Sequence, residues 1–171
     1  AGRFDWLWAP DAALALLTTW MWLRWRPLAG RGIPLLWTLH AAFLWLPLGL
    51  GLQTVASAAF ALSGDWLVGR APLHALGMGY LGSLVLAMAT RVTLGHSGRP
   101  LVMDRVTVGL FLALQVAALA RVGSELALAA SPGLFTVLLL LSVAAWLVGW
   151  LPWTARYLPM LLAPRLDGRP G

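Results

Sequence analysis

The chain has 171 residues, of which 60% are hydrophobic and 11% are charged. A soluble globular domain carries about 25% charged residues, so a chain this apolar cannot cover its surface in water and instead fits a helical membrane bundle. The net charge of +6 comes from arginines spread between apolar runs, which argues against a nucleic-acid partner. The chain has no cysteine, so a metal would need histidine, methionine, carboxylate or main-chain oxygen ligands.

Apolar segments alternate with short loops along the chain, and about 20 helical residues cross a bilayer core. We predict an all-α, polytopic transmembrane bundle, a single domain over 1–171 with about five helices at about 12–25, 34–62, 72–94, 104–122 and 132–153. Prolines open three of these helices, Asp104 is the expected N-cap of the fourth, and a shorter interfacial helix is expected to continue to Leu162. The second helix should bend near Pro47. Because the loops are short, sequential helices should be antiparallel neighbours.

The arginines are numerous on one side of the predicted membrane helices and few on the other. Nine lie in the loops at 26–33 and 95–103, at the adjoining helix ends, or after the last crossing: Arg24, Arg26, Arg31, Arg91, Arg99, Arg105, Arg156, Arg165 and Arg169. The other side has three: Arg3, Arg70 and Arg121. The positive-inside rule therefore predicts a cytoplasmic C-terminus. Tryptophans near the helix ends, Trp66 among them, fit an aromatic belt of interfacial anchors.

Three histidines are candidate metal ligands: His40, His74 and His96. His74 and His96 are about 33 Å apart on one helix at 1.5 Å per residue, so they cannot share a metal. His40 is either a hydrogen-bonded neutral side chain or a ligand of haem or copper. His74 and Met78, one turn apart, could offer Cu(I) a nitrogen and a soft sulfur, with plain packing of the methionine as the alternative.

His96 stands in a glycine-rich loop with arginines on both sides. Gly95 and Gly98 allow a ligand to approach the backbone closely, and Arg91 and Arg99 suit an anionic group such as a haem propionate or a lipid phosphate. The alternative is an ordinary interfacial loop that follows the positive-inside rule.

Other polar residues inside the predicted helices have structural interpretations. A stripe of small residues at four-residue spacing allows close approach of another helix or of a flat cofactor, and helix packing is the commoner reason: Ala75, Gly79, Ser83 and Ala87. Gln53 and Gln115 are expected to form interhelical hydrogen bonds. Arg121 and Glu125 form an expected i, i+4 pair at the outer boundary, and the acidic residues are all expected outside the membrane core.

Several stretches resemble the NnrS family: HALGMGYLGS (residues 74–83), MATRVTLGHSGRPL (88–101), LWTLHAAFLW (36–45), RYLP (156–159) and PRLDGRPG (164–171). The resemblance covers most of the chain. It implies a bacterial inner-membrane protein that contains haem and copper, has about twelve membrane helices, and is linked to nitric oxide and nitrosative stress. This chain, which begins with Ala1, would then supply the last helices of a larger bundle. The resemblance also favours His40, His74 and His96 as ligands, without saying which holds haem and which holds copper.

The function expected from these observations is haem and copper binding that contributes to resistance against nitric oxide. An alternative is a small-molecule or metal transporter subunit without a bound redox cofactor, since a proline- and glycine-interrupted helix with Gln53 near the bend is typical of transport sites. A purely structural membrane subunit is the third hypothesis.

Overall fold

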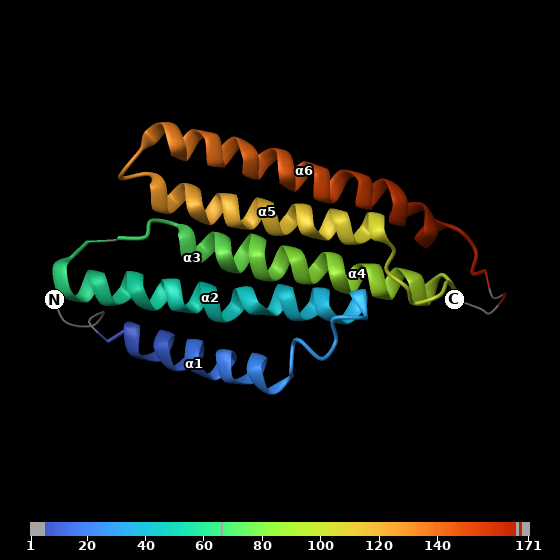
Figure 1. The fold of residues 1–171 in the computed structure, drawn as a ribbon, viewed down its shortest axis with the longest axis horizontal. Coiled ribbons are helices and arrows are strands. Elements are labelled where there is room, and N and C mark those ends of the chain that lie inside the picture. The colour runs from blue at the N-terminus through green and yellow to red at the C-terminus, as the bar shows by residue number, and fades with distance from the viewer. Residues whose placement is uncertain (1–5, 66, 167, 169–171) are drawn as a thin grey trace.

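The computed structural model describes residues 6–65, 67–166 and 168. Every regular element in these residues is helical (Figure 1): α1 Trp8–Arg24, α2 Pro34–Ser63, α3 Ala71–His74, the π-helix η1 Ala75–Gly82, α4 Ser83–His96, α5 Arg105–Ala127 and α6 Pro132–Leu162. Arg3, Trp66 and Arg169 of the charge and aromatic pattern lie outside the described residues. The prediction of an all-α bundle is confirmed.

Helix starts follow the residues that predicted them. Pro34 and Pro132 occupy first helical positions, where the missing N–H costs nothing. Asp104 is the N-cap of α5, and its side chain accepts a hydrogen bond from the Thr107 main-chain N–H at 2.9 Å. Ser131 caps α6 in the same way through the Leu134 N–H, at 3.3 Å.

Several helix bounds differ from the prediction. The first helix begins at Trp8 instead of residue 12 and ends at Arg24, because Pro10 is accommodated in the first turn. It has 17 residues and is not among the four helical stretches of the described residues that are long and apolar enough to cross a membrane: Pro34–Ser63, Ala71–His96, Arg105–Ala127 and Pro132–Leu162. The last helix was predicted to end near residue 153, yet it continues as one helix through Pro152 and Pro159. Prolines inside membrane helices are tolerated where neighbouring groups satisfy the freed carbonyls.

The α5 helix runs five residues further than the predicted end at residue 122, to Ala127. Glu125 therefore lies in the last turn of an apolar helix, inside the candidate span Arg105–Ala127, and the expectation that the acidic residues lie outside the membrane core stays a prediction. Its charge is compensated by Arg121 at 2.7 Å, which confirms the predicted i, i+4 pair. A paired carboxylate is tolerated where an isolated one would end the span.

Elements α3, η1 and α4 form one continuous span over Ala71–His96. The π-helical stretch was not predicted. Two of its glycines accept aromatic rings from other helices: a Cβ on Gly79 would lie 2.3 Å from the ring of Trp45, and one on Gly82 would lie 2.7 Å from Trp146. At Gly79 the small-residue stripe is thus filled by a side chain of α2, which agrees with helix packing as its reason.

Trp45 also begins a hydrogen-bond chain that joins three helices. Its indole Nε1 donates to Gln115 Oε1 on α5 at 2.8 Å, and Gln115 Nε2 donates to Ser83 Oγ on α4 at 2.6 Å. Ser83 is fully buried and Trp45 is 7% exposed. The interhelical role predicted for Gln115 is therefore confirmed.

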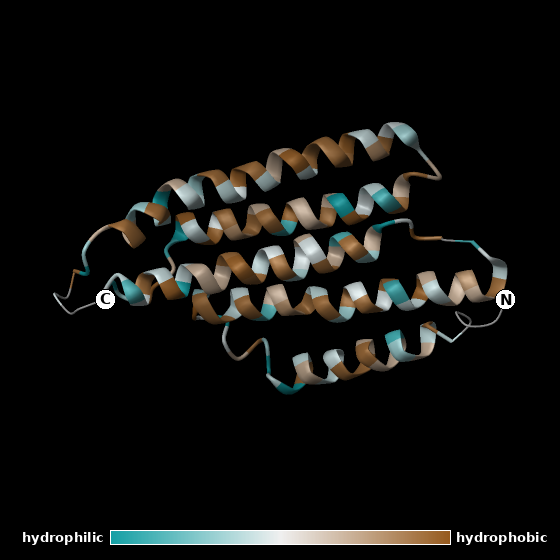
Figure 2. Cartoon of the chain, turned by 180° about the vertical axis from the view of Figure 1, so that it is seen from behind, coloured by the Kyte–Doolittle hydropathy of each residue, from teal (hydrophilic) through white to brown (hydrophobic). Residues whose placement is uncertain are grey.

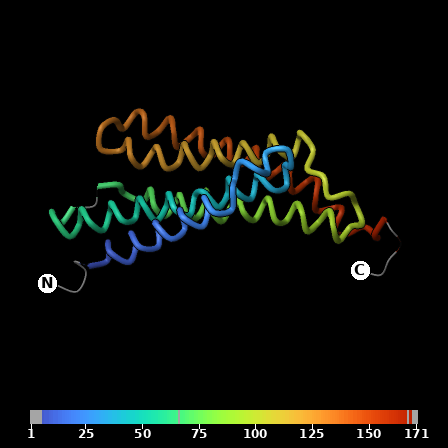
Figure 3. Tube along the Cα trace, turned by 60° about the horizontal axis from the view of Figure 1, so that its bottom comes forward, coloured from blue at the N-terminus to red at the C-terminus, as the bar shows by residue number. Residues whose placement is uncertain are grey.

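The helices lie side by side in chain order, each antiparallel to the next (Figure 1). Helix α1 packs on α2, α2 packs on η1 and α4, and α5 packs on α6. Figure 3 shows the α5–α6 hairpin set apart from α1, α2 and α4 over part of its length. We call the end with loops 25–33 and 97–104 the arginine-rich end, and the end with loops 64–70 and 128–131 the arginine-poor end.

The outer surface of the helices is apolar. Figure 2 shows hydrophobic residues along the helices, with hydrophilic ones gathered mostly toward the ends. In the most apolar stretch of α6 only 17% of the residues are buried. Leu140 and Leu151 of this helix are each 63% exposed. Such a surface is stable against lipid and unstable against water.

Candidate functional site

His40 lies in the half of α2 nearer the arginine-rich end and is half-buried. Its Nδ1 lies 2.9 Å from the main-chain carbonyl of Leu36, one turn earlier. A carbonyl oxygen can only accept, so Nδ1 carries the proton and Nε2 keeps its lone pair. This arrangement is the usual one for a metal-ligating histidine, whose other ring nitrogen is fixed by a carbonyl or a carboxylate. The Trp22 indole donates to the His40 carbonyl at 2.9 Å and ties α1 to the same turn.

Two apolar hollows flank His40. The first is lined by residues from α1, the following loop and α2: Trp22, Pro27, Leu28, Arg31, Trp37, His40, Ala41 and Leu44. The second is lined by Trp25, Leu36, Leu39, His40, Phe43, Leu84 and Met88. The first contains one cation, Arg31, and the second contains one thioether, Met88. Neither residue was singled out from the sequence.

His96 is the last residue of α4 and is exposed. It lines two hollows, one of them shared with Arg91, Gly95 and Met88. Met88 also lines the second His40 hollow, so a hollow beside His40 and a hollow beside His96 have this sulfur-containing residue in common.

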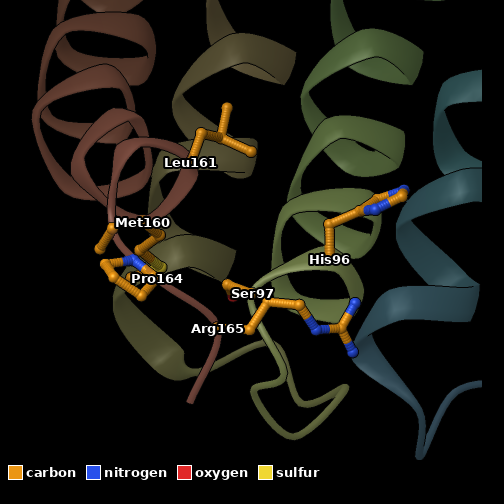
Figure 4. A pocket seen from close by; sticks show the side chains of 7 residues that line it. His96, Ser97, Met160, Leu161, Pro164 and Arg165 are labelled. Atoms are coloured by element: carbon orange, nitrogen blue, oxygen red, sulfur yellow. The ribbon is translucent and has the colours of Figure 1, made fainter. Parts of the chain in front are cut away.

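Arg165, from the segment after α6, joins the His96 site. It lines both His96 hollows, and Figure 4 shows the His96 and Arg165 side chains extending toward the same side. The Leu166 N–H donates to the Ser97 carbonyl at 3.1 Å and holds this segment against the α4 terminus. Sequence reasoning missed Arg165 because only the folded chain brings the C-terminal segment to α4.

Gly95 and Gly98 have different local roles. Gly98 has a positive φ of 68° and follows the end of α4. Its N–H bonds to the Gly95 carbonyl at 3.2 Å, and the Arg99 N–H bonds to the Leu94 carbonyl at 2.9 Å, so this turn closes the helix in the manner of a glycine C-cap. A Cβ on Gly95 would meet only Leu101, at an ordinary 3.7 Å. No protein group requires glycine at position 95.

The turn at Gly98 separates Arg99 from the other predicted anion-binding residues. Arg91 shares a hollow with His96, whereas Arg99 lines a hollow with Asp104, Arg156 and Tyr157. The sequence placed both arginines beside His96, and the structure does not bring them together.

Asp104 anchors the neighbourhood of Arg99. Its carboxylate accepts hydrogen bonds from the N–H and the hydroxyl of Thr107, and it forms an ion pair with Arg156. Burial acts to raise the pKa of Asp104, but these bonds and the positive charge of Arg156 outweigh it, so the pKa lies below its ordinary value. Asp104 therefore stays ionised at neutral pH.

His74 lies at the arginine-poor end, and His96 lies at the other end of the same continuous span. Its Nε2 is 3.8 Å from Glu125 Oε1, is buried, and has no hydrogen-bond partner among the described residues. Glu125 also accepts the Arg70 main-chain N–H at 3.0 Å. The turn before α3 can approach Glu125 this closely only with glycine at position 69. Gly69 has a φ of 51°, and a Cβ added there would lie 2.9 Å from the Glu125 carboxylate.

Met78 packs against the apolar cluster around Trp45 and Ala75. It lies in the π-helix, where hydrogen bonds run from i to i+5 and each turn is wider than in an α-helix. A four-residue spacing therefore does not align Met78 with His74 as it would in an α-helix.

Within residues 6–65, 67–166 and 168, no three histidine or carboxylate side chains come together as a metal-binding group. None of the hollows described above contains two of the three histidines. A metal at any of them would take further ligands from methionine or from other polypeptide segments.

The comparisons with known proteins agree with this architecture. Residues 1–165 match the family model described as NnrS protein. No curated protein and no solved structure matches the chain. The family match covers nearly the whole chain. The long apolar helices indicate that the chain is a multi-pass membrane protein. The chain belongs to the NnrS protein family.

Proposed function

We propose that the chain forms a haem- and copper-binding part of a bacterial inner-membrane protein that contributes to resistance against nitric oxide and nitrosative stress. Membership of the NnrS family, which is linked to the nitric oxide response, supports this proposal. The observation that carries it in this chain is the His40 ring, with Nδ1 bonded to the Leu36 carbonyl and with apolar hollows on both sides.

The residues around His40 fit a haem. Nε2 of His40, which has no hydrogen-bond partner among the described residues, would bind the iron, and the hollow walls are largely aromatic and aliphatic, as a porphyrin requires. Arg31 on one side, and Arg91 with Arg165 beyond Met88 on the other, provide positive charge suited to propionates. When bound, haem supplies an iron that takes a small ligand such as nitric oxide, while this chain orients the imidazole and excludes water.

The donors suited to copper are the remaining histidines. His96 lines a hollow with the thioether of Met88, and His74 has a buried Nε2 without a hydrogen-bond partner among the described residues. We assign His74 and His96 as copper ligand candidates, completed by residues from other helices of a larger chain. A copper ion bound by His74 would lie at the arginine-poor end, and one bound by His96 would lie at the arginine-rich end.

The orientation in the membrane follows from the charges. All described arginines other than Arg70 and Arg121 lie toward the arginine-rich end. The positive-inside rule places this end, together with the C-terminus of the chain, in the cytoplasm.

The test is the absorption spectrum and the metal content of the purified full-length protein. His40→Ala should lower haem affinity at least tenfold and remove most of the Soret band, because the imidazole that would hold the iron is lost. Added imidazole should restore the band, since it replaces the missing side chain. His74→Ala, at the opposite end of the bundle, is the matched control and should keep the Soret band.

Two results would contradict the proposal. An unchanged spectrum and metal content in His40→Ala, His74→Ala and His96→Ala would refute the ligand assignment. A colourless, metal-free wild-type protein that moves a small molecule across proteoliposomes would favour the transporter hypothesis instead.

A further inference from the structure

A separate hollow lies at the arginine-rich end, between the turn after α4, the start of α5 and the last turns of α6. Its volume is about 420 Å³, and its lining contains Leu94, Arg99, Pro100, Val102, Asp104, Arg156, Tyr157 and Met160. It shares Met160 with one of the His96 hollows but contains no histidine. The haem and copper proposal uses none of its polar residues.

The polar groups of this hollow are unequally satisfied. Arg156 is paired with Asp104, and the Tyr157 hydroxyl lies 2.9 Å from the Thr107 hydroxyl. Arg99 has no such partner: its Nη1 is buried without a hydrogen-bond acceptor among the described residues. A buried N–H donor without an acceptor is costly, and Asp104 already pairs with Arg156, so the charge of Arg99 has no partner among the described residues of the hollow.

The rest of the lining of this hollow is apolar, and part of it is exposed. Leu94 is buried, whereas Val102 at the rim is 68% exposed. Leu161 and Leu162, at the nearby end of α6, are also exposed. A ligand that fills this space gains from a negative head against Arg99 and from an apolar body against the rim.

We infer that this hollow binds the phosphate of an anionic phospholipid, with Arg99 as the direct ligand and with Arg156, held in place by Asp104, as the second cation. A guanidinium presents parallel N–H donors that match two phosphate oxygens. Free phosphate has the same head chemistry, but it would leave the apolar rim exposed. Basic pockets at the ends of membrane helices are typical sites for anionic headgroups.

The test is native mass spectrometry of the full-length protein, titrated with phosphatidylglycerol and with phosphatidylcholine of the same acyl chains. Wild-type protein should bind phosphatidylglycerol about tenfold more tightly, which corresponds to about 1.4 kcal/mol. Arg99→Gln should abolish this preference. Arg105→Gln is the matched control, because Arg105 is exposed at the same end and does not line the hollow; it should keep the preference.

Arg99→Lys distinguishes a loss of lipid binding from a folding defect, because it keeps the positive charge and loses only the paired N–H donors of the guanidinium. It should retain part of the preference. Equal loss in Arg99→Gln and Arg105→Gln, or equal affinity for the two lipids, would overturn the proposal. Displacement of phosphatidylglycerol by millimolar inorganic phosphate would overturn the lipid as the source of the phosphate. The Soret band of Arg99→Gln should be unchanged, and its loss would assign Arg99 to the haem instead.

Discussion

Gln115 is the residue whose removal most directly tests how the bundle is held together. Its side-chain carbonyl accepts the Trp45 indole N–H from α2, and its amide donates to the Ser83 hydroxyl of the α4 span. Gln115→Leu keeps a similar volume and removes both bonds at once. The indole N–H and the hydroxyl are then left in an interior where neither meets water, since Ser83 is fully buried and Trp45 is 7% exposed.

The expected loss of stability follows from these two bonds. Hydrogen bonds between membrane helices contribute about 0.6 kcal/mol on average and up to about 1.7 kcal/mol. A buried donor left without a partner costs about 1–3 kcal/mol. For Gln115→Leu we therefore expect a decrease of about 2 kcal/mol in the free energy of unfolding.

Gln53→Leu is the matched control. Gln53 lies inside α2, and its main-chain carbonyl accepts the Ser57 hydroxyl at 2.8 Å, but its side-chain amide has no hydrogen-bond partner among the described residues. The same substitution there should change stability by less than about 0.5 kcal/mol.

The assay is unfolding of the protein in mixed micelles with increasing denaturing detergent, followed by tryptophan fluorescence. A double-mutant cycle with Trp45→Phe should give a coupling energy above about 0.5 kcal/mol, because the two side chains share one bond. If Gln115→Leu costs no more than Gln53→Leu, the three-helix hydrogen-bond chain does not stabilise the bundle and the reasoning fails.

Two further predictions concern the ends of the bundle. Because the pKa of Asp104 is lowered in the fold, its ion pair stabilises the protein above the ordinary pKa of 3.8 and stops doing so as the pH falls through the lower folded-state pKa. Asp104→Asn keeps an N-cap and should flatten this pH dependence in acid unfolding curves, by less than about 1 kcal/mol since the pair with Arg156 is partly exposed; an unchanged curve would contradict the pairing. For orientation, single cysteines at the exposed positions Asp65 and Ala163 report on opposite ends, because the chain has no cysteine of its own. An impermeant maleimide should label Asp65→Cys in intact cells and Ala163→Cys only after permeabilisation, and the reverse pattern would invert the topology.

Local chemistry made most helix starts predictable. Pro34, Pro132 and Asp104 act through their own backbone or through the first turn, so the signal lies within a few residues. The π-helix could not be predicted in this way. Its glycines accept the rings of Trp45 and Trp146, which come from other helices, so the reason for the altered winding lies in tertiary packing.

The extension of α5 has a similar cause. Glu125 looks like the end of a membrane helix when it is read alone. In the fold its carboxylate receives the Arg121 guanidinium and the Arg70 main-chain N–H, and the latter bond depends on the left-handed turn at Gly69. The pattern of apolar residues along α5 cannot predict a hydrogen bond from the Arg70 main-chain N–H, which belongs to the loop before α3.

The candidate site was partly predictable for the same reasons. The histidines stand out because polar residues are rare in apolar helices, and His40 lies where the sequence placed it. Arg31, Met88 and Arg165 become neighbours of the histidines only when the chain folds. Conversely, Arg99 is three residues from His96 but lines another hollow, because the turn at Gly98 ends the helix between them.

The two ends of the bundle differ in charge in a way that links the separate proposals. Among the residues that the structure describes, the arginine-poor end has two arginines against three acidic residues, whereas the arginine-rich end has eight against one. At the arginine-poor end Glu125 is engaged by Arg121, so little positive charge is left for an anion. At the arginine-rich end Asp104 engages Arg156, and further arginines line the hollows beside His40, His96 and the proposed lipid site. Propionates and lipid phosphates should therefore both bind at the arginine-rich end, and His74, at the other end, is better suited to a cation than to the edge of a haem.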